Sequence, residues 1–279
     1  MAFPPESQEQ PPLQPQSHQG EQQQQAFIPS GQASYLLVSF THFLTVCIHN
    51  ILYYRSIYPQ ETFLMSRAYN LPVHQSRHPK VCSWIRDAVD AVRAQLARGA
   101  AERVAVVVYD SQARVAERWM FDVSAFPAWT GFDAAPRGPR TAEDDESDPS
   151  ADNDPEAGPG PGPGPVRVNW TDVDEQLRAT VRKLAYAGEK MAPLPEGCTF
   201  TVAVELRDDS EAPIGHPQPW IPTQPNLQPK SRDKHVPGRD IGGAKTTPLR
   251  AVEAGPLFFE CWVEEGRINE QVSPYASHE

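Results

Sequence analysis

The sequence lacks the close cysteine spacings that mark metal-binding or redox motifs. Its four cysteines, Cys47, Cys82, Cys198 and Cys261, are far apart in apolar stretches, and the chain contains no CxxC pair. This usage is typical of reduced thiols in a cytosolic or nuclear protein. We therefore expect buried, unpaired cysteines.

Clustered positive charge is also missing. The net charge is −11, and nine acids against two bases between residues 133 and 165 supply −7 of it, which leaves a mildly acidic remainder. Binding to duplex DNA requires clustered Lys and Arg that displace counterions. We therefore expect no direct contact with nucleic acid. If the protein acts at DNA, it would do so by binding another protein.

The N-terminal sequence has no basic segment followed by an apolar one, so no signal peptide is predicted. The most apolar stretch, residues 35–54, is interrupted by Ser, Thr, His and Asn. We expect this stretch to be too polar to span a membrane.

No set of residues supports catalysis. His74 and His78 have the spacing of helical metal ligands, but Pro79 follows and no carboxylate or cysteine lies nearby, which favours loop or capping roles over zinc. The acids at 144–146 stand among Pro and Gly, where solvated charge is the usual role. We expect no cofactor, no metal and no enzymatic activity.

Low-complexity segments frame one folded domain. Pro and Gln dominate residues 1–30, and residues 133–165 are acidic and then alternate Gly with Pro. Neither segment has the apolar side chains needed to offset its ordering entropy. We expect a disordered tail at 1–30, a domain over 31–265 with a disordered insertion at 133–165, and a tail at 266–279.

Hydrophobic periodicity predicts an α+β domain. A spacing of three and four predicts helices, and β-branched or alternating runs predict strands. The stretch 60–77 is expected to be irregular or strand-like, and the Pro-rich stretch 207–247 to be irregular and functional or disordered. The order favours an antiparallel sheet with helices on one face: helices at 34–57, 78–99 and 169–191, and strands at 103–110, 114–123, 198–206 and 257–263.

Two tryptophans have open interpretations. Trp84 lies at the edge of the apolar stripe of the second helix, where it could pack in the core or contact a partner. Trp220 lies in the Pro-rich stretch, where it could pin that stretch to the body or form part of a binding surface.

Strand alternation places polar side chains beside aromatic ones. Trp262 shares a strand face with Glu260, whereas Cys261 points the other way. A carboxylate beside a tryptophan indicates a half-apolar patch of the kind that binds partners. Alternation also places Glu117 on the same face as Trp119.

Several motifs resemble the HORMA family and, within it, the accessory subunits of translesion DNA polymerase zeta. The resemblance covers about residues 34–128 and 168–265. The blocks that carry it are His49-x-Ile51-Leu52-Tyr53-x-Arg55-x-x-Tyr58-Pro59, Tyr69-Asn70-x-Pro72-Val73, His78-Pro79, Gly197-Cys198-Thr199-Phe200-Thr201-Val202 and Pro219-Trp220-Ile221.

The resemblance implies three helices packed on an antiparallel sheet, with a C-terminal "seatbelt" over residues 207–265. In this family the seatbelt traps a partner peptide that adds to the sheet as a strand. The implied protein is a non-catalytic adaptor in DNA damage tolerance. It is located in the nucleus, or in the nucleus and the cytoplasm.

The resemblance also assigns site residues. Trp84 and Trp220 match positions that contact a peptide of the polymerase zeta catalytic subunit. Arg178 matches a HORMA–HORMA dimer surface. The positions that match contacts with the C-terminal domain of a Y-family deoxycytidyl transferase are Leu249, Glu260 and Trp262.

The chain departs from the family pattern at some of these positions. Trp84 and Trp262 each replace a Tyr, which keeps an aromatic body but loses or moves a hydroxyl. Glu260 replaces a Gln, which adds charge and removes an amide donor. The insertion at 133–165 is not part of the usual pattern. A spindle-checkpoint or meiotic-axis HORMA adaptor with another peptide client is the alternative.

Overall fold

The structure is a computed structural model that describes residues 30–126, 168–208, 210 and 245–266. The described part has the α+β character that the sequence predicts. Its helices are α1 (Ser30–Tyr54), α2 (Pro79–Ala97) and α3 (Trp170–Lys190), with a 3-10 turn at Gln60–Thr62. Its strands are β1 (Phe63–Ala68), β2 (Leu71–Ser76), β3 (Ala101–Tyr109), β4 (Val115–Asp122), β5 (Thr199–Leu206), β6 (Lys245–Ala254) and β7 (Leu257–Glu265).

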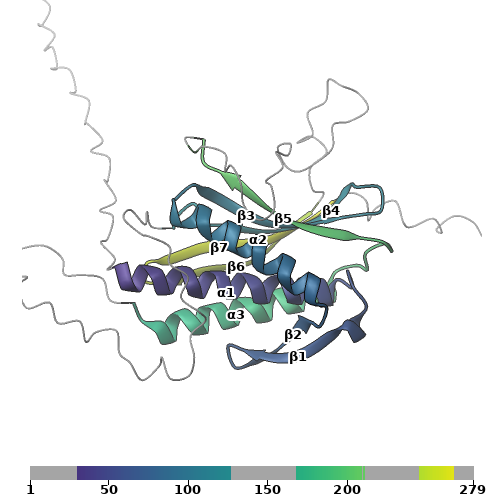
Figure 1. Ribbon diagram of the computed structural model, residues 1–279, viewed down its shortest axis with the longest axis horizontal. Helices are drawn as coiled ribbons and strands as arrows, with labels where there is room; N and C mark the ends of the chain where they lie inside the picture. Colours follow the sequence, from purple (N-terminus) through teal and green to yellow (C-terminus); the bar gives the residue numbers. More distant parts are fainter. Residues whose placement is uncertain (1–29, 127–167, 209, 211–244, 267–279) are drawn as a thin grey trace, which may run out of the picture.

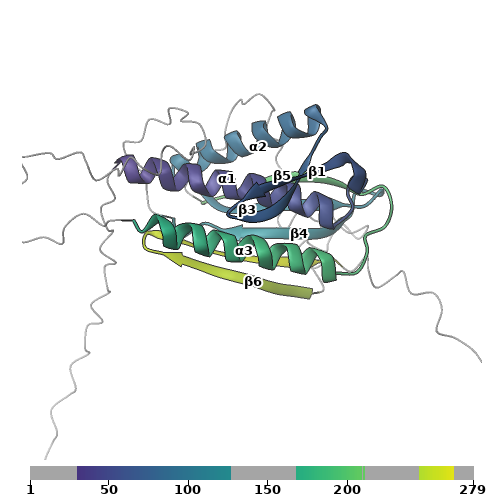
Figure 2. The same ribbon diagram turned by 90° about the horizontal axis from the view of Figure 1, so that it is seen from below.

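Helix α1 forms the centre of the domain. It contacts α2 on one side and α3 on the other, and the larger sheet forms the second layer (Figures 1 and 2). Its apolar residues recur every three or four positions, so they form a broad stripe that is buried from end to end. The stripe residues with no exposed surface include Leu36, Phe40, Phe43, Cys47 and Ile51.

By length and composition alone, α1 could cross a membrane, because Gly31–Tyr54 has a mean hydropathy of 1.5 in its most apolar window. The expectation that its polar residues would exclude this was therefore wrong on composition. Most of that window is buried inside the domain. Burial against α2, α3 and the sheet accounts for the apolar composition of this core helix.

Five antiparallel strands form the larger sheet in the order β5-β3-β4-β7-β6. Alternation along β3 sends Val104 and Val106 toward the helices and Ala105 and Val107 to the outer face. The helices therefore cover one face, which we call the inner face. A smaller apolar cluster lies on the outer face.

The stretch 60–77, expected to be irregular or strand-like, forms the β1–β2 hairpin. Tyr69 and Asn70 make its turn with φ of 50° and 55°, a conformation that suits Asn. Side chains of α1 hold the far edge of β2, because Asn50 Oδ1 accepts from the His74 N–H and His49 Nδ1 from the Ser76 N–H. The hairpin is thereby fixed to α1.

The region predicted as the seatbelt, 207–265, ends in the β6–β7 hairpin. β7 agrees with the predicted strand, whereas β6 is a strand that the sequence does not predict, and its first residues belong to the stretch predicted to be irregular. The turn between them contains Gly255 at φ 59°. Of the two predicted tails, the structure describes only Ser30, which begins α1 instead of being disordered, and Gly266, which follows β7. The rest of the tails and the 133–165 insertion lie outside the described residues.

The four cysteines carry no disulfide. Cys47 and Cys261 are buried, as expected, but Cys82 and Cys198 are half-buried. Burial raises the pKa of the Cys261 thiol to about 12, which keeps it protonated at neutral pH.

Candidate functional site

The edge strand β5 presents the first candidate surface. β5 pairs with β3 along one side, and none of the described strands pairs with its other side. Its sequence, Thr-Phe-Thr-Val-Ala-Val-Glu-Leu, contains no Pro or Gly that would interrupt a ladder. Such an edge offers main-chain donors and acceptors to an incoming strand.

Trp84 lies next to this edge. Its ring meets the ring of Phe200 on β5 edge-on, with centroids 5.0 Å apart and an angle of 77°. The Tyr58 ring also meets Phe200 edge-on, with centroids 6.3 Å apart. Trp84 is half-buried, so it both packs against β5 and keeps part of its surface available. Trp220 lies outside the described residues.

The opposite edge of the sheet is less suitable for strand addition. β6 contains Pro248, which has no N–H to donate. The ladder with β7 also shifts its register between Pro248 and Arg250, and such bulges disrupt regular pairing. The two outer edges of the described sheet are thus chemically different.

The second candidate surface lies on the outer face of the β6–β7 hairpin. Glu260 is exposed and Trp262 is half-buried on the same face of β7, as alternation predicted, with Cys261 directed inward. Trp262 packs on the outer apolar cluster. Its Nε1–H donates to Glu264 at 2.8 Å, which fixes the orientation of the ring.

Leu249 is close to this surface in the ladder but packs differently. It lies in the register shift, between Pro248 opposite Trp262 and Arg250 opposite Cys261. Its partly buried side chain packs against the main core. The structure therefore brings Leu249, Glu260 and Trp262 into one hairpin, with Leu249 at the bulge.

Arg178 lies on the side of α3 that faces away from the core. Its guanidinium forms an ion pair with Glu175 at 2.5 Å, and its side chain is 36% exposed. Two turns further along the helix, Tyr186 is 62% exposed. This face combines charge with an exposed aromatic ring, which is the composition of many association surfaces.

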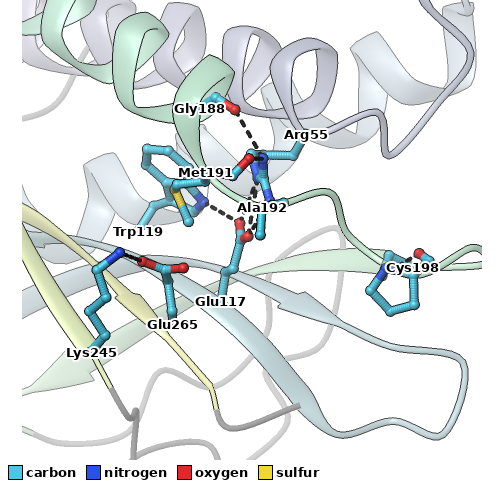
Figure 3. A network of polar contacts seen from close by, with 10 residues as sticks. Arg55, Glu117, Trp119, Gly188, Met191, Ala192, Cys198, Lys245 and Glu265 are labelled. Carbon is cyan, nitrogen blue, oxygen red and sulfur yellow. Dashed lines mark hydrogen bonds and ion pairs between the residues drawn. The ribbon is translucent and has the colours of Figure 1, made fainter. Parts of the chain in front are cut away.

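A buried ion pair, which the sequence interpretation did not include, connects α1 to the sheet. Arg55, at the end of α1, donates to Glu117 on β4 through both Nε and Nη2, and the two side chains are 3% and 0% exposed (Figure 3). Trp119 Nε1 also donates to Glu117. Strand alternation places Glu117 on the same inward face as Trp119. A carboxylate on a buried face predicts a cation beside it, because a buried carboxylate requires one.

The same guanidinium holds the connection between α3 and β5. Its Nη atoms donate to the carbonyl oxygens of Gly188, Met191 and Ala192 (Figure 3). A side chain at Gly188 would crowd this approach, since a Cβ there would lie 3.0 Å from the Tyr54 Cβ. Arg55 therefore joins α1, α3 and β4 at one point.

Glu117 also faces a second acid. Glu265 on β7 lies directly opposite Glu117 in the ladder, and Lys245 on β6 lies opposite Glu265 and forms an ion pair with it at 2.7 Å. Burial raises the pKa of Glu117, hydrogen bonding and charge from Arg55 oppose the rise, and Glu265 adds to it. The charges run across the sheet as Arg55, Glu117, Glu265 and Lys245 (Figure 3).

A cleft of about 360 Å³ adjoins Arg55, between the ends of α1 and α3 and the connection that leads into β5. In the described part of the chain, no group of three or more His, Cys, Asp or Glu side chains is arranged to hold a metal ion. The cleft residues beyond the Arg55 network include Ile57, Pro193, Leu194 and Pro195.

Known proteins of similar sequence cover most of the chain. The DNA polymerase zeta processivity subunit of Schizosaccharomyces pombe is 30% identical over 81% of this chain and 91% of its own length. The mitotic spindle assembly checkpoint protein MAD2B of Danio rerio is 28% identical over 80% of this chain and 87% of its own length.

Solved structures show the same fold. A chain in the crystal structure of a mitotic checkpoint complex aligns with a TM-score of 0.54 at 20% identity, over 84% of this chain and 98% of that one. The sequence model of the HORMA domain matches residues 37–240. The three helices on an antiparallel sheet, the sequence relatives and the domain match agree, and this chain belongs to the HORMA family.

Proposed function

We propose that this protein is a non-catalytic adaptor subunit of translesion DNA polymerase zeta. It holds a peptide of the catalytic subunit and bridges that subunit to a Y-family inserter polymerase during DNA damage tolerance in the nucleus. It contacts DNA through these partners and not directly. The proposal is supported by the similarity to the polymerase zeta processivity subunit along most of both chains.

The edge of β5 that pairs with none of the described strands is the observation that carries the proposal. A peptide in an extended conformation can add to β5 as a strand, with main-chain hydrogen bonds for affinity and side-chain pockets for selectivity. Trp84 stands beside that edge against Phe200, where it can cover part of the peptide. Trp220 would contact the peptide from the segment between β5 and β6.

The β6–β7 hairpin is the proposed surface for the inserter polymerase. Trp262 supplies a half-buried aromatic anchor, held by its hydrogen bond to Glu264, and Glu260 supplies an exposed charge beside it. Leu249 would contribute through the bulge. Because Glu260 is an acid, the matching surface of the inserter should carry a cation or a donor at this place.

Calorimetry with synthetic peptides tests the first site. Peptides that tile the catalytic subunit are titrated into the full chain, and the best binder is then titrated into Trp84→Ala and Trp220→Ala. We expect each variant to weaken binding by more than about 2 kcal/mol, as truncation of a central aromatic side chain does. Unchanged affinity in both variants would remove these residues from the site.

The two surfaces provide controls for each other. Trp262→Ala should keep the affinity for the peptide and lose binding to the C-terminal domain of the inserter, whereas Trp84→Ala should do the reverse. A variant that loses both partners would indicate a damaged fold. Thermal unfolding of each variant, compared with the parent chain, separates that outcome from a lost contact.

A HORMA adaptor of the spindle checkpoint or the meiotic axis is the alternative function. It is supported by the checkpoint name that the MAD2B relative carries. Both functions use the β5 edge, so the peptide decides between them. Purification of the chain from nuclear extract, followed by identification of the peptide bound to it, should recover the catalytic subunit if the first proposal is right.

A further inference from the structure

A second cleft, of about 320 Å³, lies between α1 and α2, and β2 contributes Gln75 to its lining. The two helices lie side by side (Figure 2). Each helix lines the cleft with one stripe of side chains, which includes Thr45 and His49 on α1 and Arg86 and Asp90 on α2. A volume of this size is at the lower end of the range for small-molecule sites.

Two hydrogen bonds to Ser76, the last residue of β2, determine which ends of the two helices meet. His49 Nδ1 accepts from the Ser76 N–H, and Cys82 Sγ donates to the Ser76 carbonyl oxygen at 3.1 Å. The C-terminal part of α1 therefore lies beside the start of α2, where Arg86 follows Cys82 by about one turn. One end of the cleft thus brings together His49, Arg86 and Gln75 from three different elements.

The polar groups at this end of the cleft offer hydrogen-bond donors. Because His49 Nδ1 accepts the bond from Ser76, the ring carries its hydrogen on Nε2. This Nε2–H has no hydrogen-bond partner among the described residues, and Arg86 is exposed and forms no ion pair with any of them. The Gln75 amide is also exposed.

The charges along the cleft are unevenly distributed. Arg86 is at the end beside His49, Asp90 follows one turn further along α2, and Arg93 lies near the opposite end. Burial lowers the pKa of both His42 and His49, so both rings are neutral at pH 7. The end beside His49 therefore combines one cation with neutral donors, while the carboxylate of Asp90 weakens the positive potential beyond it.

We propose that this end of the cleft binds a phosphate group. A phosphate monoester presents three strong acceptor oxygens and carries nearly two negative charges at neutral pH. Arg86, His49 and Gln75 approach from three elements, so each can donate to a different oxygen, and the guanidinium offsets part of the charge. A planar carboxylate presents two oxygens and matches three separate donors less well.

The phosphate group can belong to a small molecule or to a phosphorylated side chain of another protein. The site is separate from the peptide surface at β5. Trp84, which contacts Phe200 of β5, and Arg86 are two positions apart on α2, so they point to nearly opposite sides of that helix. The inference therefore does not depend on the proposed function.

Nuclear magnetic resonance of the full chain with ¹⁵N-labelled histidine tests the site. Inorganic phosphate is titrated at pH 7.5, with sodium chloride adjusted to hold the ionic strength constant. We expect a saturable shift of the His49 side-chain resonances. Arg86→Gln should raise the dissociation constant at least about tenfold, because it removes a charge-assisted hydrogen bond.

Two further variants complete the test. Arg98→Gln makes the same change at an exposed arginine that follows α2 and does not line the cleft, so the affinity should stay as in the parent chain. Asp90→Asn should lower the dissociation constant at least about twofold, because it removes the acid that faces the ligand. Thermal melts of the three variants should match that of the parent, since all three positions are exposed.

Two other probes distinguish the sources of the phosphate group. A short phosphoserine peptide that binds more tightly than glycerol phosphate would support a phosphorylated protein, and the reverse order would support a small ester. Either order is consistent with the site.

Three results would overturn the inference. One is the absence of a saturable shift at His49. Another is an acetate affinity equal to that for phosphate, which would mean that three-oxygen recognition is wrong. The last is an equal loss of affinity in Arg86→Gln and Arg98→Gln, which would mean non-specific attraction to positive charge.

Discussion

His49 Nδ1 accepts a hydrogen bond from the backbone N–H of Ser76 at 3.3 Å, which joins the C-terminal part of α1 to the end of β2. The imidazole is 5% exposed. An accepting Nδ1 requires the neutral ring, with the hydrogen on Nε2. Burial favours the same form, since it lowers the pKa of His49 to about 4.

This arrangement predicts a pH dependence of stability. Between pH 6.5 and about 4 the unfolded chain binds a proton at His49 that the folded chain does not. The contribution of His49 to the free energy of unfolding should therefore be fully present above pH 6.5. It should fall by on the order of 3 kcal/mol as the pH drops toward 4. Urea unfolding across this range measures it. His49→Asn keeps an acceptor without titrating, and an equally steep fall in that variant would contradict the assignment.

Removing one partner of the Arg55–Glu117 pair should destabilise the domain strongly. Arg55→Met leaves a fully buried carboxylate without its cation, for which a loss of about 3–5 kcal/mol is expected. The double variant Arg55→Met, Glu117→Leu removes both charges and should recover a large part of the loss. Denaturant unfolding of both variants and the parent gives the comparison, and a double variant no more stable than the single one would argue against a charge effect.

The end of β7 should tolerate no side chain at Gly266. Its N–H donates to the Ala116 carbonyl at 2.7 Å, and a Cβ there would lie 2.4 Å from the Val115 carbonyl oxygen. Gly266→Ala should lower the unfolding free energy by about 1–3 kcal/mol, because backbone must move to relieve the clash. Gly31→Ala is the control, since nothing lies within 4 Å of that position, and it should change stability little in a thermal melt.

Arg178 should affect association more than folding. Its ion pair with Glu175 is exposed, and such pairs contribute about 0.2–1 kcal/mol. If the outward face of α3 is a HORMA–HORMA dimer surface, Arg178→Ala should raise the dimer dissociation constant at least about tenfold while the melting temperature stays nearly constant. Sedimentation at several concentrations decides this. Self-association equal to that of the parent would place the dimer surface elsewhere.

The elements that follow a clear period were predictable from the sequence. For α3, the predicted range 169–191 differs from the observed Trp170–Lys190 by one residue at each end, and Asn169 caps it by accepting from the Asp172 N–H. β6 was missed because Pro248 and the polar residues around it break the alternation that strand prediction uses. Its pairing with β7 is a tertiary effect.

The candidate site was also predictable only in part, because local sequence patterns do not contain tertiary contacts. Alternation gave the shared face of Glu260 and Trp262, which is a local property of one strand. It could not show that Glu117 meets Arg55, since those residues are 62 positions apart and meet only when α1 packs on the sheet. The opposition of Glu117 and Glu265 likewise depends on strand order, which no local pattern contains.

The bonds from α1 to the edge of β2 also bear on stoichiometry. With His49 and Asn50 occupying the N–H groups of Ser76 and His74, the outer edge of β2 has fewer donors left for an added strand. Proline and the bulge interrupt β6 in the large sheet. Of the two outer edges of the described large sheet, β5 is the one suited to strand addition, so we expect each copy of the protein to hold one peptide in that sheet.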